Sequence, residues 1–289
     1  MKQKSKQQKF TSKDFGKYFP NDEACLEWIK NHRYPNGILC VSCKKITKHH
    51  KIAKRPVYEC DRCGHQVSPL AGTIFHKTTT PLTIWFDAIH EIATTRTGFS
   101  AKALQRKHGV TYKTAWRMFN QIRRLLTDNA DIFTGEVEVD ETYIGGHRKH
   151  CKTGRGAPGK TAVVGIAQRQ GKIVSNVVTD VSRYTVMPLI KKNVAKHTMI
   201  YTDEFVTYFT LDKYGYGHEQ CNHAKEEWIN GNCHTNNIEG FWSLVKRGIS
   251  GCYHAVSPKY LQLYLNEYQF RYNHRLEETP MFLTVLNQI

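Results

Sequence analysis

The hydrophobic pattern changes near residue 135 and divides the chain into two regions. Before that point, apolar residues recur at spacings of three and four, the period of an amphipathic helix. This spacing predicts a short helical segment within 14–36 and several helices within 82–126. After that point, alternating and continuous apolar runs predict strands, with helices between and after them. The expected strands cover 137–140, 161–167, 172–179 and 199–203, and the expected helices cover 185–192 and 236–247.

The segment 82–126 divides into three helices separated by turn residues. Thr97-Gly98 ends the first, Ser100 can cap a helix over 101–107, and His108-Gly109 ends that one. Thr111 can cap the third helix, whose inward positions are Ala115, Met118, Phe119, Ile122 and Leu125. Two helices joined by a short glycine-containing turn are typical of a helix-turn-helix. An ordinary helical pair with a solvated basic face is the alternative.

The second helix of that pair carries polar side chains on its outer face. In a helix-turn-helix this face enters the major groove of DNA. The expected DNA contacts are Tyr112, Lys113, Arg117 and Gln121.

The charge of the chain is concentrated in its first region. The formal net charge is +17; residues 1–130 hold 24 basic and 9 acidic side chains, whereas residues 131–289 hold 18 and 16. Because Lys and Arg neutralise phosphates, the first region is expected to bind nucleic acid. Attraction to anionic lipid is the alternative, but no amphipathic, Trp-rich basic helix is present to favour it.

Neither a membrane span nor a secretory signal is expected. No window approaches 18 consecutive apolar residues, and the Lys/Gln-rich run 1–9 has no apolar segment behind it. Together with the nucleic-acid expectation, this predicts a cytoplasmic, nucleoid-associated protein without a membrane partner.

Four of the nine cysteines form two close pairs, Cys40-x2-Cys43 and Cys60-x2-Cys63. Each pair can present two thiolates from one tight turn, and their spacing matches four-cysteine zinc sites. The pattern, with the alternation of residues 58–60, predicts a zinc ribbon. A redox dithiol or four buried structural cysteines is the alternative. The odd cysteine count favours a metal site over a disulfide framework.

A long glycine-containing loop, 145–160, separates the first two expected strands. It carries five basic and no acidic side chains, and a loop of this length in a compact domain is usually functional or disordered. Its charge favours contact with DNA. The residues concerned are Arg148, Lys149, Lys152, Arg155 and Lys160.

Carboxylates end two of the expected strands. Asp140 follows Val-Glu-Val and Asp203 follows Met-Ile-Tyr-Thr, so the two can converge above a sheet and offer the hard oxygen ligands that Mg²⁺ needs. Glu239 is a third candidate, with Lys246 two helical turns later. Glu141 and Glu204 are rival ligands, although strand alternation favours the aspartates.

Each carboxylate also has a purely structural interpretation. Asp140 and Asp203 could be turn or cap residues, and Asn236 with Glu239 could form a capping box. Their co-occurrence behind a DNA-binding region favours the metal site.

These residues lie in stretches that resemble DDE transposases of bacterial insertion sequences, in the zinc-ribbon, ISXO-type branch related to Merlin elements. The resemblance covers roughly residues 15 to 285. The stretches that carry it are the two cysteine pairs, SPLAGTIF (68–75), VEVDETYIGG (137–146), YTDE (201–204), HTN (234–236), EGFW (239–242), KRG (246–248), KYL (259–261) and RYN (271–273).

The resemblance implies a multidomain α/β protein with an RNase H-like catalytic domain. The expected division is a basic arm with a short helical segment (1–35), a zinc ribbon (36–75), a helix-turn-helix (80–130) and an RNase H-like mixed-sheet domain (131–289). The metal-binding triad would comprise Asp140, Asp203 and a residue of 236–239. Glu239 is favoured because a carboxylate binds Mg²⁺ better than an amide does; Asn236 is the other candidate.

The implied activity is nicking of the element ends and joining of the freed 3′-hydroxyl to target DNA, with two Mg²⁺ or Mn²⁺ ions and a structural Zn²⁺. Lys246 would hold a phosphate by charge. The implied partners are double-stranded DNA, through the terminal inverted repeats and the target, and further copies of the chain in a homodimer or larger synaptic complex. The alternatives are a catalytically silent DNA-binding regulator derived from a transposase and a nuclease that cuts without joining.

Overall fold

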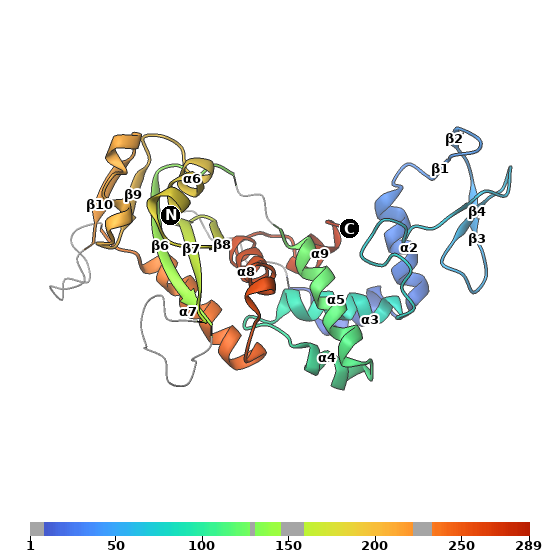
Figure 1. Ribbon diagram of the computed structural model, residues 1–289. Coiled ribbons are helices and arrows are strands. Elements are labelled where there is room, and N and C mark those ends of the chain that lie inside the picture. The colour runs from blue at the N-terminus through green and yellow to red at the C-terminus, as the bar shows by residue number, and fades with distance from the viewer. Residues whose placement is uncertain (1–8, 128–130, 146–158, 222–232) are drawn as a thin grey trace. The chain divides into compact units, whose positions relative to one another are not determined.

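The computed structural model describes residues 9–127, 131–145, 159–221 and 233–289. Contacts divide these residues into two compact units (Figure 1). The cysteine-rich unit comprises described residues of 1–95, 101–125 and 277–289, and the sheet unit comprises those of 96–100 and 126–276. The four-part division expected from the sequence stays a prediction.

The cysteine-rich unit begins with two capped helices, α1 (Ser12–Tyr18) and α2 (Asp22–Arg33). Thr11 and Asp14 form a reciprocal capping box on α1, and the Asn21 side chain accepts a hydrogen bond from the Ala24 amide to cap α2. The helical segment predicted within 14–36 is thus confirmed, as two helices.

Two small antiparallel sheets follow the helices. One pairs β1 (Leu39–Cys40) with β2 (Lys45–Ile46). The other contains β3 (His49–Lys51), β4 (Tyr58–Cys60) and β5 (Gln66–Val67). Each small sheet therefore carries part of one cysteine pair, Cys40 on β1 and Cys60 on β4.

The remaining helices of this unit are α3 (Leu82–Thr94), α4 (Ala101–His108), α5 (Tyr112–Leu125) and α9 (Met281–Leu286). The three helices predicted within 82–126 are confirmed, and the Thr111 hydroxyl accepts from the Thr114 amide as the predicted cap. Of the five positions expected to point inward on α5, four are fully buried. The fifth, Leu125, is only half-buried, while Leu126 is buried in its place.

Aromatic side chains hold this unit together. Phe19, Phe86 and Phe282 lie at the centre, with ring centroids 4.9 Å apart for Phe19 and Phe86 and 5.8 Å apart for Phe19 and Phe282. Such ring pairs add to the free energy gained from apolar burial. Phe282 lies on α9, so the last residues of the chain complete a core that begins near residue 10. The sequence pattern did not indicate this return.

The sheet unit contains a five-stranded mixed sheet in the order β10-β9-β6-β7-β8. Strands β6, β7 and β8 are antiparallel neighbours, whereas β9 runs parallel to β6 and β10 runs parallel to β9. Four of the strands were predicted and β10 was not; the expectation that Asp140 ends its strand is wrong, because β6 continues to Ile144 and places Asp140 within the strand. Their bounds are β6 (Glu136–Ile144), β7 (Thr161–Gln168), β8 (Ile173–Val178), β9 (Met199–Thr202) and β10 (Gly217–Gln220).

Helices cover both faces of this sheet. Helix α6 (Arg183–Asn193) and the 3-10 turn η1 (Val206–Tyr208) pack on the face that contains Val137 and Val139. Helices α7 (Asn236–Gly248) and α8 (Pro258–Asn273) pack on the other face, and a π-helical turn η4 (Ile249–Tyr253) follows α7 directly. Because side chains alternate along a strand, Glu138 and Asp140 of β6 point toward α7.

One disulfide was not foreseen from the spacing of the cysteines. Cys221 and Cys233 are bonded, and both are buried beside Tyr201. The cysteine pattern predicted a metal site rather than a disulfide framework and gave no prediction for this pair, because no short motif links the two cysteines that the fold brings together. No helix of the described ranges is long and apolar enough to cross a membrane.

Candidate functional site

Three carboxylates meet where β6 and β9 lie side by side. One oxygen from each of Asp140, Glu141 and Asp203 can be chosen so that all lie within 4.8 Å of one another. The parallel register pairs Glu138 with Tyr201, so two residues further along Asp140 comes beside Asp203. The structure thus brings together the two aspartates that the sequence singled out, and it adds Glu141.

The electrostatics of this group are unfavourable without a cation. Burial, and then the negative charges of Glu141 and Asp203, raise the pKa of Asp140 from 3.8 to about 7. Clustered hard oxygen donors of this kind fit a divalent ion such as Mg²⁺ or Mn²⁺, whose charge would reverse the repulsion.

Glu141 points to the opposite face of the sheet from Asp140. Its Oε2 accepts a hydrogen bond of 3.0 Å from the hydroxyl of Tyr208, and burial together with this carboxylate raises the pKa of Tyr208 well above 10. Tyr208 therefore stays protonated and orients Glu141. Side chains do alternate along β6, which was the reason for favouring Asp140 over Glu141. One carboxylate oxygen of Glu141 nevertheless lies within 4.8 Å of oxygens of Asp140 and Asp203.

Asp203 has two roles in the structure. Its Oδ1 accepts a hydrogen bond of 3.1 Å from the backbone amide of Phe205, which closes the turn after β9. The turn role considered from the sequence therefore exists alongside membership of the carboxylate group. Glu204, the neighbouring rival, is exposed.

The first turn of α7 carries the third candidate ligands. Asn236 and Glu239 are exposed, and Glu239 Oε1 accepts a hydrogen bond of 2.6 Å from the Thr235 hydroxyl. Glu239 lies outside the 4.8 Å group, although its charge contributes to the raised pKa of Asp140. Lys246, two turns along the same helix, is exposed.

A tryptophan of α7 contacts the carboxylate group directly. The indole Nε1 of Trp242 donates a hydrogen bond of 3.1 Å to Oδ2 of Asp140. The close approach of α7 depends on Gly165 of β7, which pairs with Asp140. A Cβ at Gly165 would lie 2.4 Å from Trp242 Cζ2 and 2.6 Å from Ile238 Cδ1.

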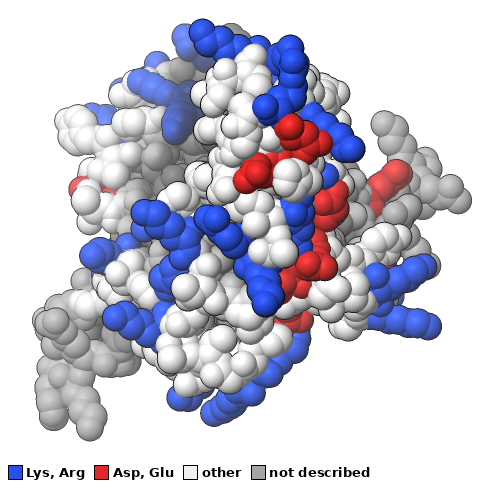
Figure 2. Space-filling view, turned by 90° about the vertical axis from the view of Figure 1, so that its right-hand side faces the viewer, with Lys and Arg blue, Asp and Glu red and all other residues white. Residues whose placement is uncertain are grey.

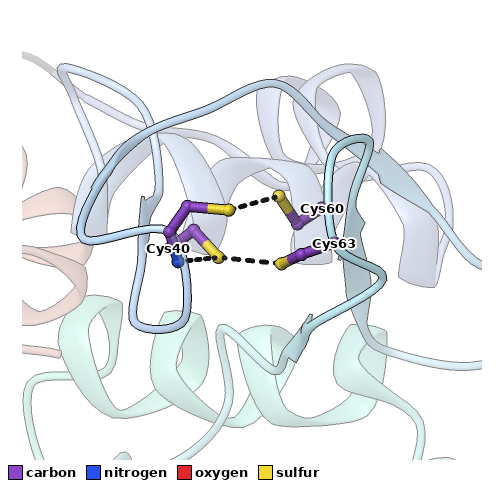
Figure 3. Close-up of side chains that lie close together, drawn as sticks. Cys40, Cys60 and Cys63 are labelled. Atoms are coloured by element: carbon purple, nitrogen blue, oxygen red, sulfur yellow. Dashed lines mark hydrogen bonds between the residues drawn. The ribbon is translucent and has the colours of Figure 1, made fainter.

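The four predicted zinc ligands lie together (Figure 3). The Sγ atoms of Cys40 and Cys63 are 3.5 Å apart, and those of Cys43 and Cys60 are 4.0 Å apart. Four sulfurs about 2.3 Å from a tetrahedral Zn²⁺ would be about 3.8 Å apart, so this geometry fits a zinc ion.

The backbone of the two cysteine turns is similar. The residue after each pair, Lys44 or Gly64, has a positive φ, of 54° and 72° respectively. A hydrogen bond from the Thr47 hydroxyl, followed by the amides of Arg62 and Cys63, lowers the pKa of Cys60 to about 6. Donors placed around a thiolate favour its charged form, which is the form that binds metal.

The predicted DNA contacts on α5 lie on the outside of that helix. Tyr112, Lys113 and Arg117 are exposed, whereas Gln121 is half-buried. Arg117 and Gln121 line a cavity of about 590 Å³ that α5 shares with residues 72–74 and the last two residues of the chain. Lys160 precedes β7 and is half-buried. The other four loop residues lie outside the described residues: Arg148, Lys149, Lys152 and Arg155.

Basic side chains border a narrow acidic band on the face seen in Figure 2. Several acidic residues of the cysteine-rich unit form ion pairs with basic residues of the same unit, including Glu23 with Lys51 and Glu27 with Lys30. Asp87, His90 and Glu91 form another cluster with metal-ligand atoms, but Lys107 pairs with both of its carboxylates. This cluster is therefore an internal ion-pair network rather than a cation site.

Two further residues beside the site were not singled out from the sequence: Trp242, which contacts Asp140, and Glu138, which contacts α7. The signal for Glu138 was present, because a residue two positions before Asp140 on a strand shares its face. Nothing in the local pattern identified the partner of Trp242, since that contact joins residues 102 positions apart.

Comparisons with protein families agree with this arrangement. Residues 132–273 match the ISXO2-like transposase domain, and residues 20–66 match the transposase zinc-ribbon domain. These two matches cover the carboxylate group and the four cysteines respectively.

Two similar proteins are also described as related to transposable elements or transposases. A Halobacterium salinarum protein, described as an uncharacterized protein in transposable element ISH50, is 26% identical over 275 residues, covering 88% of this chain and 92% of that protein. An uncharacterized transposase-like protein of Haemophilus influenzae is 30% identical over 118 residues, covering 41% of this chain and 93% of that protein.

Among solved structures, a chain from a cryo-EM structure of the simian T-cell lymphotropic virus intasome in complex with PP2A regulatory subunit B56 gamma is similar at 12% identity. The similarity covers 57% of this chain and 63% of that chain with a TM-score of 0.30. At that score the likeness carries no weight for the fold.

Proposed function

The chain belongs to the ISXO2-like family of insertion-sequence transposases with an N-terminal zinc ribbon, and on that premise we propose that it is an active DDE transposase. It binds the terminal inverted repeats of its element, nicks the ends and joins the 3′-hydroxyl to target DNA. The observation that carries this proposal is the meeting of Asp140 and Asp203 at adjacent strands.

The strand order supports an RNase H-like catalytic domain. Three antiparallel strands are followed by two parallel ones, and β6 lies at the centre of the sheet with Asp140 on it. Asp140 lies on the central strand β6, and Asp203 follows the end of its parallel neighbour β9. The distance between the two carboxylates is therefore set by the register of the sheet. The ligands are then held by rigid elements rather than by loops.

Two divalent ions, Mg²⁺ or Mn²⁺, would when bound polarise the scissile phosphate and lower the pKa of the attacking hydroxyl. Asp140, Asp203 and Glu239 would hold them, with Asn236 as the other candidate and Glu141 as an added one. Trp242 fixes the orientation of Asp140, and Thr235 fixes that of Glu239. Lys246 binds a DNA phosphate by charge.

The cysteine-rich unit supplies DNA recognition in this proposal. Zinc held by Cys40, Cys43, Cys60 and Cys63 rigidifies the ribbon, and α4 and α5 act as a helix-turn-helix that presents Tyr112, Lys113, Arg117 and Gln121 to the major groove. The excess of Lys and Arg among residues 1–130 supports this assignment. Because two element ends have to be joined, the active form is a homodimer or a larger synaptic complex on double-stranded DNA.

A strand-transfer assay tests the proposal. Purified protein, Mg²⁺ and labelled DNA from the flanks of the gene should give joined product with wild type and none with Asp140→Ala, while both bind the DNA. Cleavage without joining would indicate a nuclease. Binding without either reaction, in Mg²⁺ and in Mn²⁺, would indicate a silent DNA-binding regulator.

A further inference from the structure

The amino end of α7 has no cap of its own. Thr235 occupies the N-cap position, but its side chain makes no capping hydrogen bond. Its hydroxyl donates instead to Glu239. The first amides of a helix need an acceptor, and without one they carry the full positive end of the helix dipole.

That acceptor comes from the sheet. Oε2 of Glu138, on β6, accepts hydrogen bonds from the amides of Asn237 and Ile238, at 2.8 and 3.1 Å. Oε1 accepts from the Asn237 side chain at 2.7 Å and from Arg169 Nε at 3.1 Å. The Glu138 side chain is completely buried.

These four hydrogen bonds use the acceptor capacity of the carboxylate, which is about four lone-pair sites. Glu138 therefore has no oxygen free for an ion, although it lies two residues from Asp140 on the same face of β6. Its contacts join the strand that carries Asp140 to the helical turn that carries Asn236 and Glu239.

Arg169 and His234, which both lie beside Glu138, make further contacts. Arg169 donates from a terminal nitrogen to the carbonyl oxygen of His234 at 2.9 Å, and the His234 ring nitrogen Nδ1 lies 3.2 Å from Glu138 Oε1. The guanidinium of Arg169 also lies over the Tyr201 ring, 3.9 Å from its centroid. The segment that leads into α7 is thus held to β6, β7 and β9.

From this arrangement we infer that Glu138 is a positioning residue that sets the distance between Asp140 and the ligands at the start of α7. It acts in place of a local N-cap and leaves the Thr235 hydroxyl free to orient Glu239. The inference rests on the proposed function, because it assigns the α7 turn to the ion site.

The test compares Glu138→Gln with Glu267→Gln in the full-length protein. Glutamine keeps the shape of Glu138 but replaces one acceptor oxygen with an NH₂ group, so at least one pair of donors loses its partner. Glu267 is the matched control: it is equally buried and ion-paired with Arg271 within the sheet unit. Its hydrogen-bond partners include Tyr253 and Arg271, neither of which lies in the first turn of α7.

Mn²⁺ binding, measured by calorimetric titration, is the first readout. Glu138→Gln should weaken it by 10-fold to 100-fold, the range found for residues that orient metal ligands, and Glu267→Gln should change it by less than 2-fold. Both variants should lower the melting temperature by several degrees. Equal weakening by both variants, or unchanged binding in Glu138→Gln, would overturn the positioning role.

Hydrogen exchange without metal is the second readout. The amides of Asn237 and Ile238 should lose protection in Glu138→Ala, which removes both acceptor oxygens, and keep it in Glu267→Ala; protection kept in both would overturn the inference. If Glu138→Gln fails to fold, Glu138→Asp, which keeps the charge on a shorter stem, takes its place with the same expectations. Equal Mn²⁺ binding by wild type and Asp140→Ala would instead remove the ion site, and the positioning role with it.

Discussion

The indole nitrogen of Trp242 donates a hydrogen bond to the Oδ2 atom of Asp140, which connects the first turns of α7 to the central strand of the sheet. This bond favours the charged form of Asp140 against the burial and neighbouring charges that oppose it. Trp242 is thus part of the carboxylate site, although its side chain cannot bind a metal ion.

Trp242→Phe should weaken Mn²⁺ binding and strand transfer, each by about 10-fold, because the remaining ring keeps most of the packing but cannot donate. Calorimetric titration and the strand-transfer assay measure the two effects. The matched control is Trp28→Phe on α2, which should leave Mn²⁺ affinity unchanged. Wild-type affinity in Trp242→Phe would show that the hydrogen bond has no role in ion binding.

Gly165→Ala should destabilise the protein by about 1–3 kcal/mol, since the new methyl group would overlap the side chains of Trp242 and Ile238. Urea unfolding measures the loss. Gly240→Ala, on the exposed side of α7 with nothing within 4 Å of the added carbon, is the control; it should be neutral or stabilising by up to about 1 kcal/mol. Similar destabilisation by both would contradict the packing argument.

Cys60→Ser should abolish zinc binding and unfold the ribbon, because four thiolates are needed to complete the tetrahedral site. Elemental analysis should find one zinc per chain in wild type and none in the variant. Cys252→Ser changes a cysteine of the sheet unit that forms no disulfide and should retain the zinc. A normal zinc content in Cys60→Ser would remove the ribbon assignment.

The metal-free protein should become less stable as pH rises from about 4 to about 7. Across this range the folded state keeps a proton on Asp140, whose pKa is about 7, whereas the unfolded chain has released it. The folded state therefore binds more protons, and the free energy of unfolding falls by at most about 1.4 kcal/mol per pH unit.

Urea unfolding at pH 5, 6, 7 and 8 measures this slope. Saturating Mg²⁺ should reduce it, because an ion favours the charged carboxylate. Asp140→Asn, which has no titrating group at that position, should show a flatter profile without metal. An unchanged slope in that variant would assign the pH dependence to another residue.

Arg117→Ala should weaken binding to the element ends and reduce the dependence of the affinity on salt, by about one unit of slope if Arg117 contacts a phosphate. Fluorescence anisotropy at several salt concentrations measures both quantities. Lys30→Ala removes a basic residue that is already paired with Glu27 and serves as the control. Equal losses in the two variants would indicate a general charge effect rather than a contact by α5.

Much of the sheet unit could be predicted from local pattern. Alternation and apolar runs gave β6, β7, β8 and β9, because each of these strands buries side chains in a regular register. Strand β10 was missed: it is a four-residue edge strand, Gly217–Gln220, with no buried residue to mark it. Helix α8 was also missed, because its buried residues include polar ones such as Asn266, Glu267 and Gln269.

Of the candidate site, only the residues that could bind a metal directly were predictable from the sequence. The two aspartates and the cysteine pairs follow from residue type and spacing, and the structure brings each set together. The supporting contacts of Trp242 and Glu138 join residues about 100 positions apart, so only the folded chain reveals them. The position of Glu239 outside the closest carboxylate group likewise depends on where α7 lies on the sheet.

The return of residues 277–289 to the cysteine-rich unit has a consequence for synthesis of the protein. The core around Phe19 and Phe86 needs Phe282, which is translated after the whole sheet unit. At elongation rates of roughly 5 to 20 residues per second, roughly 8 to 30 s pass between Leu125 and Glu277 leaving the ribosome. The part of the chain made first therefore completes its core last, and the cysteine-rich unit reaches its final form only after α9 has been translated.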